Sequence, residues 1–287
     1  QAEIIQSIAS GRDTLALMPT GGGKSLTFQV PAMAMEGICI VVTPLIALMK
    51  DQVENLKKQN VSAAAIFSGM THAEILKTLE NAVFDAYKFL YVSPERLSTE
   101  IFIKKVTQMN VSMIAVDEAH CISQWGYDFR PSYLRIAEIR SLMPDVPVLA
   151  LTATATAEVV DDIQVQLQFK QKNVFRKSFH RHNLIYVVRN AENKDEQLLR
   201  ILKSVPGTSV VYVRNRKKTK EIADLLNQNG IKADYFHAGL KNETKDERQA
   251  RWKSNETRVI VATNAFGMGI DKPDVRTVVH MDLPDSL

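Results

Sequence analysis

The chain has 287 residues, of which 45% are hydrophobic and 24% are charged, and its net charge is +4. These values are ordinary for a globular protein with one large core or two medium ones, and the small basic excess permits a polyanionic partner without requiring one. No apolar run is long enough to span a membrane, so no membrane partner is expected. The two cysteines, Cys39 and Cys121, lack CxxC partners, which argues against a structural zinc site and favours reduced thiols inside a cell.

Short apolar runs alternate with amphipathic stretches from the first residues onward. Helix-like segments such as Ile46–Gln59 and Ala73–Val83 lie between the apolar runs. This alternation predicts a parallel sheet with helices on both faces. The strands predicted in the first part of the chain are Thr14–Met18, Ile38–Val42, Phe89–Val92, Met113–Val116 and Val148–Leu151.

The pattern pauses over the polar and basic residues 170–183 and then resumes. We predict two α/β domains, residues 1–178 and 179–287, joined near Lys177–His182. The strands predicted in the second domain are Leu184–Val188, Ser209–Tyr212, Ala233–Tyr235, Val259–Ala262 and Val278–His280. The chain begins with Gln1 and ends at Leu287 in the middle of a pattern. We therefore expect both ends to be cuts, not natural termini.

A glycine-rich loop follows the first predicted strand. The strand runs into Pro19-Thr-Gly-Gly-Gly-Lys-Ser25, and a helical stretch follows. The backbone N–H groups of Thr20 and of Gly21, Gly22 and Gly23 could curl around a phosphate, and the helix start adds a positive dipole. Lys24 would reach the β- and γ-phosphates, and the Ser25 hydroxyl would hold Mg²⁺. The strict phosphate-loop pattern has glycine where this chain has Met18, so a glycine-rich turn with an incidental lysine is the alternative.

Two adjacent acids follow the apolar strand Met113–Val116. Carboxylates at the carboxyl end of a parallel strand lie where such sheets bind ligands. Asp117 would hold Mg²⁺ directly or through water, and Glu118 would orient or deprotonate the attacking water. A solvated loop is the alternative for two adjacent acids alone. An upstream phosphate loop favours the catalytic interpretation, because both features follow buried strands and must meet on one sheet edge.

The acid pair opens a longer motif, Asp117-Glu-Ala-His120 followed by Cys121-Ile-Ser-Gln-Trp-Gly-Tyr-Asp-Phe-Arg-Pro131. This motif closely resembles the RecQ family of superfamily 2 DNA helicases, and the part through Trp125, Phe129 and Arg130 is its specific portion. It resembles the aromatic-rich loop that couples DNA binding to ATP hydrolysis in that family; a small satellite core is the alternative. Further motifs fall in the family's order. They begin at Gln1, Thr43, Tyr91, Leu151, Phe236 and Ala262.

The resemblance covers essentially the whole chain and implies two RecA-like domains with ATP bound in the cleft between them. It implies that Gln1 reads the adenine, that Asp271 touches the ribose and that Gly269 lines the same edge. It implies Mg²⁺ as the second cofactor. The residues expected at DNA are Thr43, Ser93, Trp125, Phe129, Arg130, His237 and Thr263.

The implied activity is ATP hydrolysis coupled to 3′ to 5′ translocation on single-stranded DNA and to unwinding of forked DNA, in repair or recombination. The expected location is intracellular: cytoplasm or nucleoid in a bacterium, nucleus in a eukaryote. Two alternatives stay open, an RNA helicase of the DEAH or DEAD class and an ATP-gated clamp that does not unwind. The family's motif Gln-x-x-Gly-Arg-x-Gly-Arg, which supplies an arginine to the γ-phosphate, is absent from the 287 residues. We therefore expect this piece to bind nucleotide without being a working helicase.

Overall fold

The structure is a computed structural model that describes residues 1–19, 21–126, 128–153, 155–178, 183–264, 266–267, 270 and 272–282. Contacts divide the chain into two compact units, Gln1–Asn183 and Leu184–Leu287. The division falls a few residues after the predicted one at residue 178, and residues 179–182 of the predicted junction lie outside the described part. Among the described residues, no helix combines the length and the apolar content needed to cross a bilayer.

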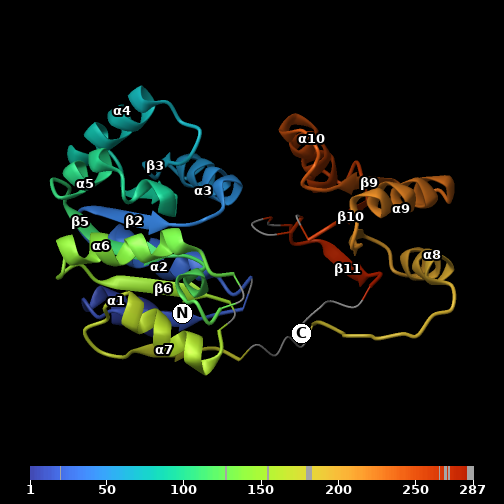
Figure 1. The fold of residues 1–287 in the computed structure, drawn as a ribbon, viewed down its shortest axis with the longest axis horizontal. Coiled ribbons are helices and arrows are strands. Elements are labelled where there is room, and N and C mark those ends of the chain that lie inside the picture. The colour runs from blue at the N-terminus through green and yellow to red at the C-terminus, as the bar shows by residue number, and fades with distance from the viewer. Residues whose placement is uncertain are drawn as a thin grey trace. The chain divides into compact units, whose positions relative to one another are not determined.

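The first unit is built on a parallel sheet of seven strands in the order β3-β4-β2-β5-β6-β1-β7 (Figure 1). Five of its strands coincide with predicted ones to within two residues at either end. The strands are β1 (Thr14–Leu17), β2 (Ile38–Val42), β3 (Ala63–Ile66), β4 (Phe89–Val92), β5 (Val111–Val116), β6 (Val148–Thr152) and β7 (Val174–Arg176). The prediction of a parallel α/β domain is confirmed for this unit.

Helices cover both faces of the first sheet. One face packs against α1 (Ala2–Ala9), α2 (Lys24–Ala34) and α3 (Ile46–Lys58). The other packs against α4 (His72–Val83), α5 (Glu100–Val106), α6 (Arg135–Leu142) and α7 (Ala157–Gln166). Short 3₁₀ turns are η1 (Pro94–Arg96), η2 (Ala119–Ile122) and η3 (Pro131–Leu134). Because both faces are covered, the central strands are apolar without alternation; β2 and β4, for example, are buried at every residue.

The second unit contains a parallel sheet of four strands in the order β11-β8-β10-β9. The strands are β8 (Thr208–Tyr212), β9 (Ala233–Phe236), β10 (Val259–Ala262) and β11 (Val275–His280). Side chains of α8 (Lys194–Ser204) and α9 (Arg216–Gln228) form the apolar core on one face. On the other face, Trp252 from α10 (Asn242–Lys253) packs with Phe236 and Phe266.

The predicted strand Leu184–Val188 is wrong. These residues are not in a strand, and their exposed fractions run from 46% for Leu184 to 89% for Ile185. Branched and aromatic residues favour strands only where a neighbouring strand supplies hydrogen bonds and packing. In the part of the chain that the structure describes, no strand pairs with residues 184–188, so their preference for strand conformation does not produce a strand.

Candidate functional site

The predicted site residues of the first unit lie in a row along one edge of its sheet. Strands β4, β2, β5, β6 and β1 are successive neighbours and all run parallel. Their carboxyl ends therefore share one edge. In that order, the strands are followed by Ser93, Thr43, the pair Asp117–Glu118, the turn after Thr152, and the glycine-rich loop. The sheet order thus places the loop and the acid pair two strands apart, with Thr152 between them.

The glycine-rich loop folds back tightly before α2. Gly21 and Gly23 have φ values of 73° and 77°, in the left-handed region that a side chain disfavours. The Gly22 N–H donates to the Pro19 oxygen at 2.9 Å, and a Cβ on Gly22 would lie 2.7 Å from that oxygen. Helix α2 begins at Lys24, directly after this curl. The loop has the conformation of an anion cradle at a helix N-terminus. Thr20, the remaining predicted loop residue, lies outside the described residues.

The Gln1 side chain lies on this loop. Its Nε2 donates to the Gly22 oxygen at 2.7 Å. A Cβ on Gly23 would meet the same Nε2, which is the end of a flexible side chain and can move, so glycine is favoured here by its backbone conformation. The predicted adenine reader and the predicted phosphate loop are therefore in direct contact.

The acid pair is held in an unusual backbone conformation. Glu118 has φ 48°, which costs energy for a residue with a side chain and is frequent at functional sites. Its N–H donates to Asp117 Oδ1 at 3.0 Å. Its carboxylate faces Lys24, with Nζ and Oε1 3.8 Å apart. The structure therefore brings together the phosphate-loop lysine and the predicted catalytic acid.

Burial, and then the Glu118 carboxylate, raise the pKa of Asp117 from its ordinary value to about 6, against a smaller lowering by Lys24. The charged carboxylate is therefore short of positive charge. A divalent cation would supply that charge, and carboxylate and hydroxyl oxygens are the donors that Mg²⁺ prefers. Asp117 and Ser25, which lies half-buried in the first turn of α2, thus fit the predicted magnesium ligands in their chemistry.

His120 connects the acid pair to the end of β6. Its Nδ1 lies 2.9 Å from Thr152 Oγ1 and 3.4 Å from Glu118 Oε2. Burial lowers the pKa of His120, so the ring is neutral at pH 7 and its contact with Glu118 is a polar contact, not an ion pair. Sequence reasoning quoted both residues inside motifs but gave neither a role. The signal for Thr152 was its position at the end of the buried strand β6, which borders both β1 and β5, and the signal for His120 was its place two residues after Glu118.

Tyr133 connects the aromatic-rich segment to the acid pair. Tyr133 is fully buried, and its hydroxyl donates to the Asp117 backbone oxygen at 2.9 Å. Trp125, by contrast, is 75% exposed, and Phe129 is half-buried. Arg130 donates to Asp128 Oδ2 through Nε at 3.2 Å and Nη2 at 2.9 Å. The segment is therefore divided: Tyr133 belongs to the core, while Trp125 is open for stacking.

The hydroxyls of Thr43 and Ser93 are buried and have no hydrogen-bond partner among the described residues. Both follow neighbouring strands paired Val42 to Val92, so they lie side by side at the sheet edge. The two residues stay a prediction for DNA contact.

In the second unit, His237 and Thr263 follow the paired residues Phe236 and Ala262 and lie together at the carboxyl edge of that sheet. Burial, then Arg216, Arg248 and Lys245, lower the pKa of His237. Its Nδ1 is buried without a partner in the described part of the chain. This edge is therefore cationic, as a polyanion site requires.

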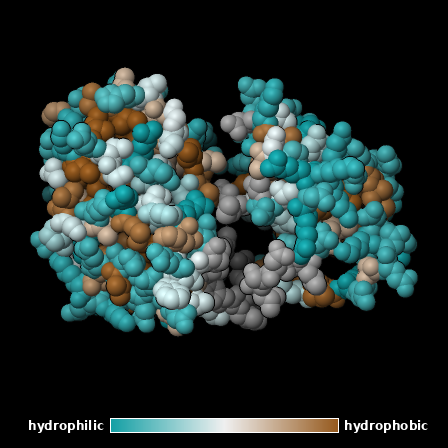
Figure 2. All heavy atoms as spheres, in the orientation of Figure 1, coloured by the Kyte–Doolittle hydropathy of each residue, from teal (hydrophilic) through white to brown (hydrophobic). Residues whose placement is uncertain are grey.

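Arg248 also lies at this edge and was not predicted as a site residue. Its guanidinium carbon lies 3.7 Å from the centre of the Tyr235 ring. Tyr235 in turn stacks on His237, with ring centres 5.9 Å apart. Figure 2 shows that the face of this unit in view is mostly hydrophilic. Two predicted nucleotide residues, Gly269 and Asp271, lie outside the described residues.

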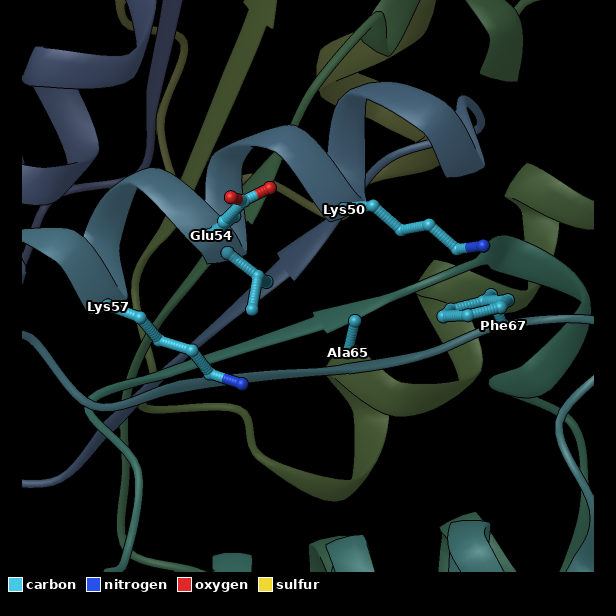
Figure 3. Close-up of a pocket in the computed structure, with 6 residues that line it drawn as sticks. Lys50, Glu54, Lys57, Ala65 and Phe67 are labelled. Atoms are coloured by element: carbon cyan, nitrogen blue, oxygen red, sulfur yellow. The ribbon is translucent and has the colours of Figure 1, made fainter. Parts of the chain in front are cut away.

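An open groove of about 310 Å³ lies between α3 and the edge strand β3 (Figure 3). The Lys50 ammonium is 4.8 Å from the centre of the Phe67 ring, and Glu54 pairs with Lys58 at 2.9 Å. The groove is lined by Lys50, Val53, Glu54, Lys57, Ala65 and Phe67. None of these is a predicted site residue, although Phe67 follows β3 at the same carboxyl edge as Ser93.

The first unit thus combines a phosphate loop and an acid pair on one sheet edge, and the second unit has a cationic edge of its own. Comparison with known proteins agrees: the DEAD/DEAH box helicase family matches residues 1–163, and the helicase conserved C-terminal domain matches residues 193–287. The chain therefore belongs to the DEAD/DEAH box helicase family.

The relatives narrow the family further. The ATP-dependent DNA helicase RecQ of Bacillus subtilis is 43% identical over 100% of this chain and 49% of its own length. RecQ of Pasteurella multocida is 41% identical over 100% of the chain and 46% of its own length. Over its whole length the chain is therefore similar to RecQ helicases. A putative ATP-dependent RNA helicase of Acanthamoeba polyphaga mimivirus is 39% identical over 100% of the chain and 53% of its own length. The chain thus spans about half the length of the curated relatives it matches.

Solved structures support the fold. A DUF1998 helicase, MrfA, bound to DNA and AMPPNP, superimposes with a TM-score of 0.77 over 99% of this chain and 44% of that chain, at 15% identity. At that identity the likeness concerns the fold alone. It confirms the expected pair of RecA-like α/β domains.

Proposed function

We propose that this chain is the motor of an ATP-dependent DNA helicase. The observation that carries the proposal is the row of groups along one sheet edge: the phosphate loop, Thr152, the acid pair, and the Thr43–Ser93 pair. A nucleotide bound at one end of this row and a nucleic-acid strand bound at the other would both lie close to the acid pair. The named activities of the RecQ relatives support the same function.

Each residue near the nucleotide has a distinct task. The amides of Gly21–Gly23 and the Lys24 ammonium bind the phosphates and stabilise their charge. Gln1 lies against the loop and orients the base. Glu118, positioned between Lys24 and His120, orients the attacking water and accepts its proton. His120, neutral and hydrogen-bonded to Thr152, keeps the Glu118 carboxylate in place. Gly269 and Asp271 complete the nucleotide contacts.

Mg²⁺ is the proposed second cofactor, held by Asp117 and Ser25. When bound, it supplies charge neutralisation at the phosphates. The raised pKa of Asp117 supports this assignment, because an uncompensated carboxylate at a sheet edge is what a cation ligand presents before the cation binds.

The proposed substrate is single-stranded and forked DNA, moved 3′ to 5′, with a role in repair or recombination inside the cell. Trp125, exposed beside Phe129 and Arg130, stacks on bases. The hydroxyls of Thr43 and Ser93 and the cationic edge at His237 and Thr263 hold phosphates. The same proposal keeps the two domains as predicted from the sequence, with the first ending at residue 178 and the second beginning at residue 179.

The alternative of an RNA helicase is supported by one relative's name, since a 39% identical protein is a putative RNA helicase. ATP hydrolysis by the protein should be measured with no nucleic acid, with single-stranded DNA and with RNA of matched length. A DNA helicase gives the largest rate with DNA, and a larger rate with RNA would favour the alternative. Strand displacement from a forked duplex, measured on a complete motor that also contains the arginine motif, then separates a helicase from an ATP-gated clamp.

A further inference from the structure

Three side chains with metal-binding atoms meet beside the acid pair. His120 and Cys121 lie in the η2 turn, and Asp128 lies in the segment that follows it. Their ligand atoms are all within 4.8 Å of one another. His120 Nε2 is 3.8 Å from Cys121 Sγ, and Cys121 Sγ is 3.7 Å from Asp128 Oδ2. Nitrogen, sulfur and oxygen donors therefore surround one small volume.

These separations match a tetrahedral soft-metal site. With Zn–N near 2.0–2.1 Å and Zn–S near 2.3 Å, a tetrahedral ion separates its nitrogen and sulfur ligands by about 3.6 Å. The two measured separations are within a few tenths of an ångström of that value. The third separation, between His120 and Asp128, is up to 4.8 Å, so the Asp128 side chain must move inward to place all three donors on one ion, and water would take the fourth position.

The surroundings already orient the histidine for this role. Nδ1 of His120 is engaged by the Thr152 hydroxyl, which leaves Nε2 directed at Cys121. A hydrogen bond at one ring nitrogen is what fixes a metal-binding histidine in place.

We propose that His120, Cys121 and Asp128 form a binding site for a soft divalent cation, Zn²⁺ being the natural candidate, distinct from the magnesium ligands Asp117 and Ser25. On binding, the Cys121 S–H bond breaks, the sulfur–metal bond forms and the proton leaves to solvent. No CxxC pair is involved, which is why cysteine spacing alone does not predict the site.

Occupation of this site would change the aromatic-rich segment. Asp128 Oδ2 now accepts both hydrogen bonds from Arg130, so the cation and Arg130 compete for that oxygen. The cation would also tie Asp128 to the η2 turn and hold the segment against the acid pair. Zn²⁺ should therefore reduce the response of ATP hydrolysis to DNA. This consequence rests on the proposed function, whereas the cation site does not.

The test of the site uses Co²⁺ as a spectroscopic substitute for Zn²⁺, added to the protein without nucleotide. We expect a thiolate-to-cobalt charge-transfer band that saturates with one ion and disappears when Zn²⁺ is added. The band should be lost in Cys121→Ser and retained in Cys39→Ser, the control, because among the described residues Cys39 in β2 belongs to no group of metal-binding side chains. Asp128→Asn changes a half-buried side chain and should keep the band but weaken Co²⁺ binding by about tenfold or more.

Two results would overturn the site: no charge-transfer band in the parent protein, or a band that Cys39→Ser removes and Cys121→Ser leaves. Unchanged Co²⁺ affinity in Asp128→Asn would remove the carboxylate from it. The consequence is tested separately, by comparing Zn²⁺ inhibition of DNA-stimulated ATP hydrolysis in the parent and in Cys121→Ser. A cobalt band with equal Zn²⁺ inhibition in both would keep the site and reject its effect on coupling. A protein without DNA stimulation would instead contradict the proposed function.

Discussion

At the scale of single residues, the burial that suits Asp117 for binding a cation also lowers the stability of the folded protein. Its raised pKa, about 6 against an ordinary 3.8, means that the folded protein binds this proton more tightly than the unfolded chain does. Below about pH 4 both states are protonated and nothing is lost. As the pH rises through 6, the folded state loses up to about 3 kcal/mol, because each pKa unit corresponds to about 1.4 kcal/mol.

Asp117→Asn should therefore raise the melting temperature of the nucleotide-free protein at pH 7.5, and the gain should vanish near pH 4. Thermal unfolding across this pH range measures it. Asp145→Asn, at a side chain that is 95% exposed, is the matched control and should change little. A melting temperature that falls at pH 7.5 in Asp117→Asn would show that burial does not penalise this carboxylate.

Tyr133 offers a second test at this scale, because one hydroxyl joins the aromatic-rich segment to the acid pair. Tyr133→Phe keeps the buried ring and removes only the donor to the Asp117 oxygen. We expect a loss of about 1 kcal/mol of unfolding free energy, and a higher Mg²⁺ concentration for half-maximal ATP hydrolysis. The Mg²⁺ dependence separates positioning from simple stabilisation. An unchanged dependence would leave Tyr133 with a packing role alone.

At the scale of elements, a buried ion pair fixes the ends of the sheet opposite the site. Arg140 of α6 donates to both oxygens of Asp13, just before β1, at 3.0 and 3.1 Å, and both side chains are almost fully buried. Asp13 also accepts from the N–H groups of Val148 and Lys170. One carboxylate thus ties together α6, the start of β6, and the turn that leads to β7.

Asp13→Ala should cost about 3–5 kcal/mol of unfolding free energy, because it leaves Arg140 buried without its partner. Asp145→Ala breaks the exposed Lys170–Asp145 pair and should cost less than about 1 kcal/mol. Chemical denaturation of both variants makes the comparison. Similar losses would mean that burial adds nothing to the Asp13 contacts.

The exposed Trp125 allows the role of the aromatic-rich segment to be separated from folding. Trp125→Ala removes a side chain that is 75% exposed, so stability should hardly change. Basal ATP hydrolysis should stay near the parent value, while stimulation by single-stranded DNA falls, since one stacking contact is worth about 1–3 kcal/mol per base. Steady-state ATP hydrolysis with increasing DNA measures both. Full stimulation would favour the satellite-core alternative.

Much of the first unit could be predicted because its central strands are buried on both faces and read as continuous apolar runs. Strand β3 was missed because Ala63-Ala64-Ala65 lacks the branched residues typical of strands, and β7 because it lies in a polar stretch. The glycine-rich loop and the acid pair were found because each follows a buried strand. The contacts of His120, Thr152 and Tyr133 depend on sheet order and on the fold of the segment after η2, which no local pattern contains.

At the scale of the whole molecule, the chain consists of two units, each with its own parallel sheet and its own candidate site residues. The first unit holds the phosphate loop and the acid pair. The second presents a cationic edge around His237, Arg216 and Arg248. The proposed motor needs both, since hydrolysis belongs to one unit and part of the grip on the strand to the other.

The most direct test of this account is a comparison of the parent protein with Glu118→Gln. Mg·ATP binding and DNA-stimulated ATP hydrolysis should be measured on the same preparations. We expect the variant to bind Mg·ATP about as well as the parent, because the phosphate loop, Lys24 and Asp117 are unchanged, and to have almost no turnover with or without DNA. Turnover close to that of the parent would contradict the assignment of Glu118, and with it the proposed arrangement of the site.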